Sequence, residues 1–212
     1  YGNDIRLKSN STDVWITETV DSFSGSTRPK IAVDSTGGIH LVYGHYEGSG
    51  GYSPYNGIMY ATNGSGVWNY KLISTDRIHN PSLAIDTNNK VHIAACELNS
   101  YTRDMICYLS NKSGTWTTEY ELSPVNILSS SFIPIAVDSK NNYHIDFLNT
   151  YDSGGVTLNY RTANYGSQII YNAYAVINNL NTDIFYVIVD SVGFVHHFYV
   201  LNNILYHATD LD

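Results

Sequence analysis

The chain has 212 residues, of which 43% are hydrophobic and only 14% are charged, and its formal net charge is −8. This length and apolar content are sufficient for one β-rich domain with a buried core. The acidic balance and the lack of a lysine or arginine cluster argue against nucleic acid as a partner. No apolar run approaches the length of a membrane span, so membrane insertion is not expected.

Residues 1–23 predict two short strands, around Ile5–Leu7 and from Val14 onward, joined by a polar turn. From residue 28 a longer unit begins and then recurs. Its most regular feature is a triplet of apolar residues followed by an aspartate. The four aspartates are at positions 34, 86, 138 and 190, so successive copies are 52 residues apart. This period predicts an all-β fold, a β-propeller built from four-stranded antiparallel blades.

Each unit predicts four strands, A to D. The triplet forms strand A, a tight turn follows the aspartate, strand B begins near a histidine, strand C carries a tyrosine and strand D opens with tryptophan. We interpret 1–212 as one propeller domain with blades at 28–75, 80–124 and 131–176. Residues 1–23 then supply strands C and D of a partial blade, and 182–212 supply strands A to C of another.

Four copies of strand A fit either a four-bladed ring or part of a larger ring. A closed ring has no exposed sheet edges. We therefore expect residues 14–20 to pair, as an outer strand, with Ile204–His207.

The repeated aspartates and histidines are expected to be structural. Aspartate side chains accept backbone N–H groups within tight turns, and one carboxylate per turn is too few for calcium. Equivalent histidines in different blades lie too far apart to share a metal. No metal and no cofactor are expected at the histidines His40, His92, His144 and His196.

The two cysteines, Cys96 and Cys107, fall on strands B and C of one predicted hairpin. If Leu98 faces Met105, the two cysteines are directly opposed on one face of the sheet. Opposed residues of antiparallel strands are close enough for a disulfide. We therefore expect contact between the two side chains, with two unbonded thiols as the alternative.

The turn before the second tryptophan, Ser110–Trp116, reads SNKSGTW. It resembles the Asp-box of sialidase-like propellers, although it is one residue shorter and lacks the aspartate. The whole unit is similar to Asp-box (BNR-type) repeats of secreted bacterial and archaeal proteins. The resemblance implies the propeller fold. The low charge and the high content of Asn, Ser and Tyr favour an extracellular or cell-surface location. Asn10, Asn63 and Asn111 fit the glycosylation pattern, but we interpret them first as turn residues.

Candidate ligand-binding residues lie where propellers usually bind ligands, at the D–A connections and B–C loops. The longest B–C loop runs from Glu47 to Asn56, and long insertions in a fold with short turns are often functional. The candidates at these connections are Arg28, Arg77 and His79 on the D–A side, and His45, Tyr46, Tyr52, Tyr55, Glu97, Asn149 and Tyr151 on the B–C side.

Three functions remain open. The first is a secreted or cell-surface, lectin-like module that binds a carbohydrate or glycoconjugate through its tyrosine-rich loops. The second is a polysaccharide-active enzyme, a lyase or a sialidase-like glycosidase, with His45 and Tyr46 as base and acid and Arg28 or Arg77 as a carboxylate clamp. The third is a structural or assembly propeller of a larger surface protein. Open blade edges would also allow self-association.

Overall fold

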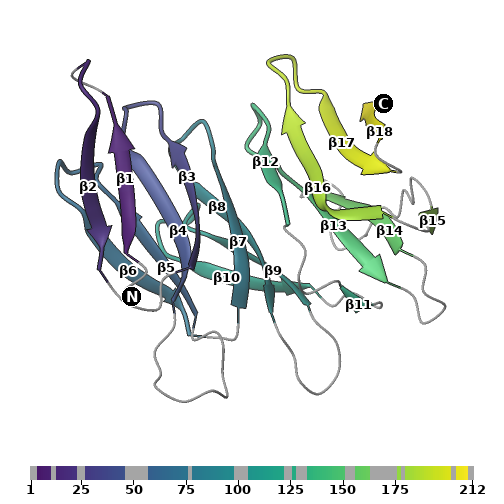
Figure 1. The fold of residues 1–212 in the computed structure, drawn as a ribbon, viewed down its shortest axis with the longest axis horizontal. Coiled ribbons are helices and arrows are strands. Elements are labelled where there is room, and N and C mark those ends of the chain that lie inside the picture. The colour runs from purple at the N-terminus through teal and green to yellow at the C-terminus, as the bar shows by residue number, and fades with distance from the viewer. Residues whose placement is uncertain are drawn as a thin grey trace. The chain divides into compact units, whose positions relative to one another are not determined.

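The structure, a computed structural model, describes residues 4–10, 13–22, 27–45, 57–75, 78–97, 105–121, 126–127, 133–150, 156–162, 176–177, 180–201 and 204–209. Every element in these segments is a β-strand (Figure 1). They contain no helix long and apolar enough to cross a membrane. The chain divides into two units, Tyr1–Pro81 and Ser82–Asp212.

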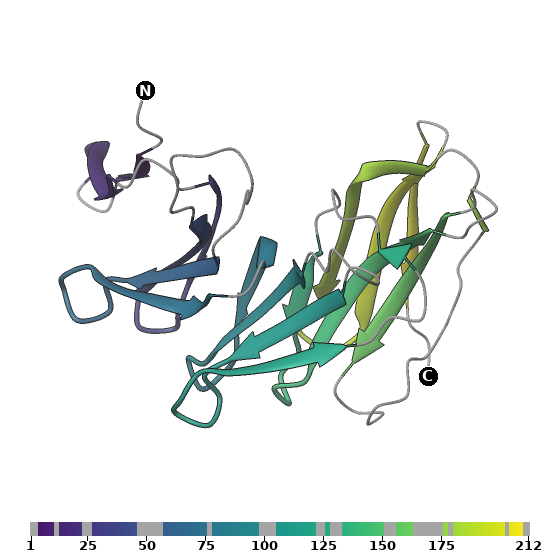
Figure 2. The same cartoon turned by 90° about the horizontal axis from the view of Figure 1, so that it is seen from below.

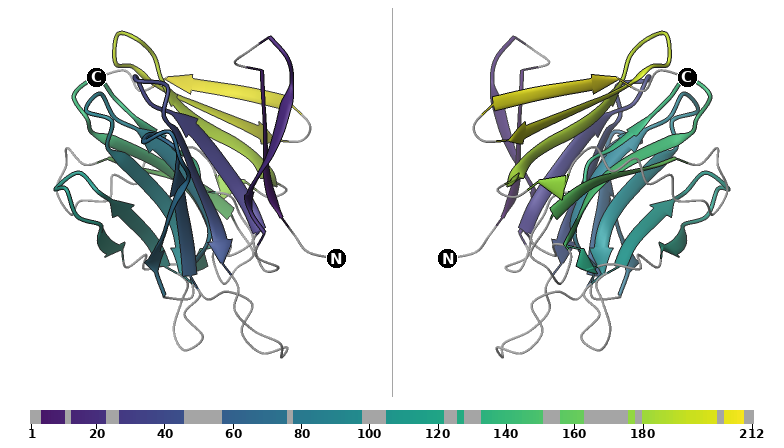
Figure 3. Two further views of the ribbon diagram at one scale, coloured as in Figure 1. Left: turned by 90° about the vertical axis from the view of Figure 1, so that its left-hand side faces the viewer. Right: turned by 90° about the vertical axis from the view of Figure 1, so that its right-hand side faces the viewer.

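The first unit contains a hairpin and a four-stranded antiparallel sheet. The hairpin is drawn in purple in Figure 3, and the sheet has the strand order β3-β4-β5-β6. Its hydrophobic core joins Ile5 and Val20 of the hairpin to Leu41, Tyr43 and Ala61 of the sheet. The strands are β1 (Ile5–Ser9), β2 (Ile16–Asp21), β3 (Thr27–Val33), β4 (Ile39–His45), β5 (Gly57–Thr62) and β6 (Asn69–Ser74).

Three further antiparallel sheets follow. Their strand orders are β7-β8-β9-β10, then β11-β13-β14-β15 with β12 also paired to β13, and finally β16-β17-β18. Strand β7 begins in the first unit and ends in the second. The strands are β7 (Ile78–Ile85), β8 (Val91–Glu97), β9 (Met105–Ser110), β10 (Thr117–Glu121), β11 (Asn126–Ile127), β12 (Ile135–Val137), β13 (Tyr143–Thr150), β14 (Val156–Thr162), β15 (Val176–Ile177), β16 (Leu180–Val189), β17 (Val195–Leu201) and β18 (Ile204–Thr209).

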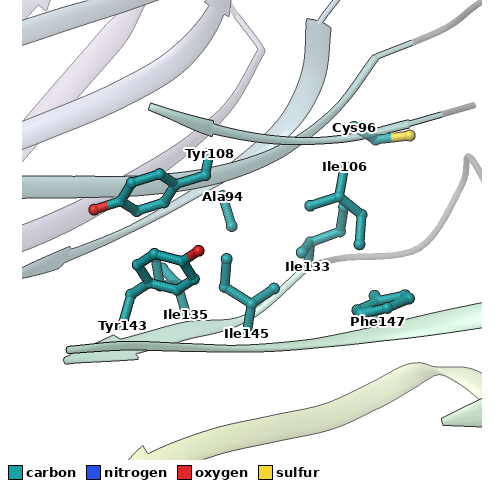
Figure 4. Close-up of a cluster of buried hydrophobic side chains, with 9 residues drawn as sticks. All are labelled: Ala94, Cys96, Ile106, Tyr108, Ile133, Ile135, Tyr143, Ile145 and Phe147. Atoms are coloured by element: carbon teal, nitrogen blue, oxygen red, sulfur yellow. The ribbon is translucent and has the colours of Figure 1, made fainter. Parts of the chain in front are cut away.

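Alternation along β13 gives this strand two buried faces. Tyr143, Ile145 and Phe147 face the sheet of β8 and β9, while His144 and Asp146 point to the opposite side, because successive side chains of a strand alternate. The first face belongs to the apolar cluster of Figure 4: Ala94, Cys96, Ile106, Tyr108, Ile133, Ile135, Tyr143, Ile145 and Phe147. Each large side chain buried there contributes roughly 1.5–3 kcal/mol.

A second cluster lies between the sheet of β12–β14 and the sheet of β16–β18. Figure 2 shows the strands of these two sheets, in green and in yellow, facing each other. Tyr160 packs there against Val187 and Val195, with Ala136 and Val189 alongside. Successive sheets of the second unit therefore stack through their faces, as the blades of a propeller do.

The turn after each strand A is held by its aspartate, as predicted. Oδ1 of Asp34 lies 2.8 Å from the backbone nitrogens of both Thr36 and Gly38, which donate to it. Asp86, Asp138 and Asp190 accept backbone N–H groups in the same way. Each turn also contains one left-handed residue at the same repeat position, namely Gly37, Asn89, Asn141 and Gly193. Glycine and asparagine tolerate this conformation best.

The second carboxylate oxygen connects each aspartate to the histidine of its own unit. Oδ2 of Asp86 is 3.2 Å from Nε2 of His92, and Nδ1 of His92 is 2.7 Å from the Tyr108 hydroxyl. Neutral His92 then donates a hydrogen bond from Nε2 to the aspartate and accepts a hydrogen bond at Nδ1 from the tyrosine hydroxyl. The first unit repeats this chain with Tyr60. In the third unit His144 bonds to Tyr160, and its Nε2 lies 3.5 Å from Asp138. The fourth unit has His207 in place of the tyrosine.

Asp86→Ala is expected to destabilise the protein by about 3 kcal/mol. The buried carboxylate accepts two backbone N–H groups and the ring of His92, and its loss leaves a buried donor without an acceptor. Urea unfolding followed by circular dichroism measures the change. Asp190→Ala is the matched control, because its side chain is 34% exposed and water can replace it. Equal losses in the two variants would contradict the proposed role of burial.

The predicted pairing of residues 14–20 with Ile204–His207 would join the two units, and it stays a prediction. β2 pairs with β1, and the described partner of β18 is β17. A hairpin between neighbouring strands costs little loop entropy. Strand β2 therefore has a backbone hydrogen-bonding partner, β1, within the first unit.

The predicted register of the cysteine hairpin is wrong by one residue. Cys96 opposes Ile106, and Cys107 opposes Ala95. The connection contains seven residues, 98–104, instead of the six that the prediction assumed, and a one-residue shift moves a side chain to the other face. The two cysteines are buried thiols on opposite faces, with no disulfide between them. Figure 4 shows Cys96 within the apolar cluster.

Candidate functional site

Three candidate residues of the first unit lie at the same end of its strands. Arg28 is the second residue of β3, His45 is the last residue of β4, and His79 is the second residue of β7. β3 and β4 are antiparallel, and Thr27 pairs with Gly44, which places Arg28 beside the end of β4. β7 starts four residues after β6 ends at Ser74.

Buried polar side chains gather at this end. His45, Ser74, His79 and Asn80 are buried, each at most 7% exposed. A strand end is usually solvated, and burying a polar group costs free energy unless it is hydrogen-bonded. His45 and Ser74 end strands of the β3–β6 sheet, whereas His79 and Asn80 lie in β7, an edge strand of the next sheet. Buried polar groups at strand ends, together with an exposed arginine, are typical of binding sites.

His79 is neutral at physiological pH. Burial lowers its pKa to about 4, a hydrogen bond with Asn80 opposes this shift, and the positive charge of Arg28 adds to it. Neutral His79 offers one N–H donor and one nitrogen acceptor. This pair suits a hydroxyl group, which both donates and accepts.

The backbone is strained at this end in two equivalent places. Arg28 and Asn80 are 52 residues apart, and each has a φ of 53°. Both precede a proline, Pro29 or Pro81, which disfavours helical conformations of the preceding residue. Left-handed non-glycine residues cost about 1–3 kcal/mol and are concentrated at functional sites. Sequence reasoning missed Asn80, although the repeated X-Pro step marks its position.

Glycine shapes the same strand end. Gly57 pairs with His45 and has a φ of 140°, which few other residues adopt. A Cβ atom at this position would lie 1.9 Å from the carbonyl oxygen of Ser74. Close approach of β5 and β6 therefore requires glycine here.

The other seven ligand-binding residues predicted from the sequence are not among the described residues of this strand end. Glu97 ends β8 and is partly buried, and Asn149 lies in β13 opposite Ile127 and Thr157. Both belong to the second unit. The other five candidates lie outside the described residues: Tyr46, Tyr52, Tyr55, Arg77 and Tyr151.

Within the described segments, no group of three or more His, Cys, Asp or Glu side chains is placed to hold a metal ion. Three of the repeated histidines, His40, His92 and His196, instead hydrogen-bond to their own turn aspartates.

Comparison with known proteins identifies solved structures with a similar fold. The chain aligns with the Hadza microbial sialidase Hz136 at a TM-score of 0.62 and 9% identity, covering 87% of this chain and 44% of that one. A protein of unknown function from Dyadobacter fermentans aligns at 0.63 and 14% identity, covering 88% and 66%. The polysaccharide lyase Uly1 aligns at 0.50 and 11% identity, covering 99% and 67%.

The chain therefore spans about half to two thirds of the length of these structures. No family model and no curated protein matches its sequence. At these identities the likeness concerns the fold alone, and it agrees with the antiparallel sheets described above. The protein has an all-β, β-propeller-class fold, as its 52-residue repeat predicted.

Proposed function

We propose that the protein is a carbohydrate-binding module, extracellular or on the cell surface, whose site is the strand end formed by Arg28, His45, His79 and Asn80. The observation that carries the proposal is the buried imidazole of His79, which is neutral because burial and the positive charge of Arg28 lower its pKa. Neutral donors and acceptors match sugar hydroxyls, and the guanidinium group adds up to five N–H donors.

The chemistry of this group favours binding over catalysis. A general base works best with a pKa near the operating pH. His79, with a pKa of about 4, is a weak base at pH 7 because burial disfavours its charged form. A hydrogen-bonding role needs only the neutral ring. Solved propellers that include a sialidase and a polysaccharide lyase show that similar folds serve carbohydrate chemistry in other proteins.

A glycan array probed with the labelled 212-residue chain tests the proposal. We expect retention on one class of glycan, with the bound saccharide unchanged when it is recovered and weighed by mass spectrometry. Binding to no glycan would contradict the proposal. Recovery of cleaved saccharide, with a new reducing end or an unsaturated sugar, would replace it with a glycosidase or a lyase.

A further inference from the structure

The fourth repeat unit has a histidine where the other three have a tyrosine. In those three units, Nδ1 of the repeat histidine hydrogen-bonds to a tyrosine hydroxyl, which belongs to Tyr60, Tyr108 or Tyr160. His207 is the equivalent residue of β18, because it opposes Phe198, two places after His196. The three tyrosines oppose the corresponding residue of their own units. A second imidazole therefore faces His196 in place of a phenol.

The two imidazoles point ring nitrogens at each other. Nδ1 of His196 lies 2.9 Å from Nε2 of His207, and the ring centroids are 5.1 Å apart, with 21° between the ring planes. The hydroxyl oxygen of Thr209 lies 3.4 Å from each of these nitrogens. All three side chains come from the hairpin of β17 and β18, in which His196 opposes Thr209. One pair of neighbouring strands therefore brings two nitrogens and one oxygen together.

Both rings are held in position by neighbouring groups. Nε2 of His196 lies 3.2 Å from Oδ2 of Asp190, whose other carboxylate oxygen accepts three backbone N–H groups of its turn. Neutral His196 donates its proton from Nε2 to this carboxylate and presents a bare Nδ1. Histidines that bind metals usually have a carboxylate or carbonyl on the other ring nitrogen in this way. The ring of His207 stacks on Phe198 at a centroid distance of 4.6 Å.

We propose that His196, His207 and Thr209 bind a divalent transition-metal ion of the zinc type, with water in the remaining coordination positions. Two neutral imidazoles can each turn a bare nitrogen to one cation. With zinc–nitrogen distances of about 2.0–2.1 Å and a tetrahedral angle, the nitrogens lie about 3.3 Å apart and the ring centroids about 5.2 Å apart. The observed centroid distance is 5.1 Å, so the rings need only turn in place to accept the ion.

The donor atoms select the class of ion. Imidazole nitrogen suits zinc, copper and nickel, whereas calcium and magnesium take oxygen ligands. Two imidazoles and one hydroxyl are fewer ligands than a closed structural zinc centre has, and open zinc sites complete their shell with water. The expectation that the repeat histidines hold no metal concerned histidines of different units. His196 and His207 belong to one sheet, so that distance argument does not apply to them.

Calorimetric titration of the chelator-treated chain with zinc chloride tests the proposal. We expect saturable binding of one ion per chain, and no binding of Mg²⁺ or Ca²⁺ at the same concentrations. His207→Tyr introduces the residue type of the other three units, so the chain should keep its fold. This variant should bind zinc roughly tenfold more weakly or worse, because one of two nitrogen ligands is lost. Thr209→Val removes only the hydroxyl and should weaken binding less.

The swapped variant Tyr206→His/His207→Tyr is the matched control. It keeps all eight histidines of the chain but moves the imidazole to the other face of β18, because successive side chains of a strand alternate. It should bind zinc as weakly as His207→Tyr. Wild-type affinity in either variant, with a native circular dichroism spectrum, would overturn the proposal, since other histidines would then hold the ion.

Nuclear magnetic resonance of the unmodified chain provides a readout that does not depend on how the variants fold. Zinc should shift the imidazole ¹⁵N resonances of His196 and His207 before those of the other histidines. No saturable zinc binding, or earlier shifts at other histidines, would contradict the proposed site.

Discussion

His197→Ala is expected to destabilise the second unit by about 3–5 kcal/mol, because it leaves a buried carboxylate without its partner. Nδ1 of His197 lies 3.0 Å from both carboxylate oxygens of Asp146. The two side chains are 1% and 0% exposed. Burial raises the pKa of Asp146, and the hydrogen bond with His197 opposes the shift. Desolvation is therefore the main electrostatic cost of this pair.

The repeat itself supplies the matched control. The positions equivalent to Asp146 and His197, 52 residues earlier, are Ala94 and Ile145. These two belong to the apolar cluster of Figure 4. Ala94 and Ile145 already pack against each other's sheets, between β8 and β13. The double variant Asp146→Ala/His197→Ile places the same two residue types at the equivalent positions between β13 and β17.

We expect the double variant to recover the wild-type stability or to exceed it by about 1–4 kcal/mol, as apolar replacements of buried ion pairs often do. Guanidinium unfolding followed by tyrosine fluorescence, with hydrogen exchange of β13 and β17, measures both effects. A double variant as unstable as His197→Ala would contradict this account, since it would show that the local packing, and not the uncompensated charge, sets the loss.

Gly57→Ala is expected to destabilise the first unit by about 3 kcal/mol. The φ of 140° is unfavourable for alanine, and the new Cβ would meet the Ser74 carbonyl oxygen at 1.9 Å. The strand end must then open, which displaces His45, the pairing partner of Gly57. Carbohydrate binding should weaken even at temperatures where the variant remains folded.

Gly66→Ala separates the two causes. Gly66 also has a positive φ, 84°, but nothing lies within 4 Å of the point that an alanine Cβ would occupy there. Thermal unfolding should show a loss of about 1 kcal/mol for this control. The explanation by steric contact would fail if the two alanine variants lost the same stability.

Local features of the fold could be predicted from the sequence. The turn aspartates were found because a tight turn is decided by residues four positions apart, as in Asp34 and Gly38. The fold class followed from the 52-residue period. The prediction of strand register failed where the register depended on the length of a loop. The connection between β8 and β9 is one residue longer than predicted, which places Cys96 and Cys107 on opposite faces of the sheet.

Contacts between distant segments were harder to predict. Asp146 and His197 are 51 residues apart, and nothing in either local sequence shows that they meet. The sequence nevertheless contained a signal. Asp146 and His197 are polar residues at two repeat positions that are occupied by the apolar residues Ala94 and Ile145 in the preceding units. At the candidate site, Arg28 and His79 were named from the sequence, but the proximity of their charges appears only in the folded chain.

The carbohydrate site at the strand end is tested most directly by calorimetric titration with the glycan that the array identifies. Arg28→Ala should weaken binding at least tenfold, about 1.4 kcal/mol, because it removes the cation beside His79. Lys71→Ala, which removes an exposed cation from β6 of the same sheet, should bind like the wild type. Wild-type affinity in a folded Arg28→Ala chain would show that the ligand binds elsewhere.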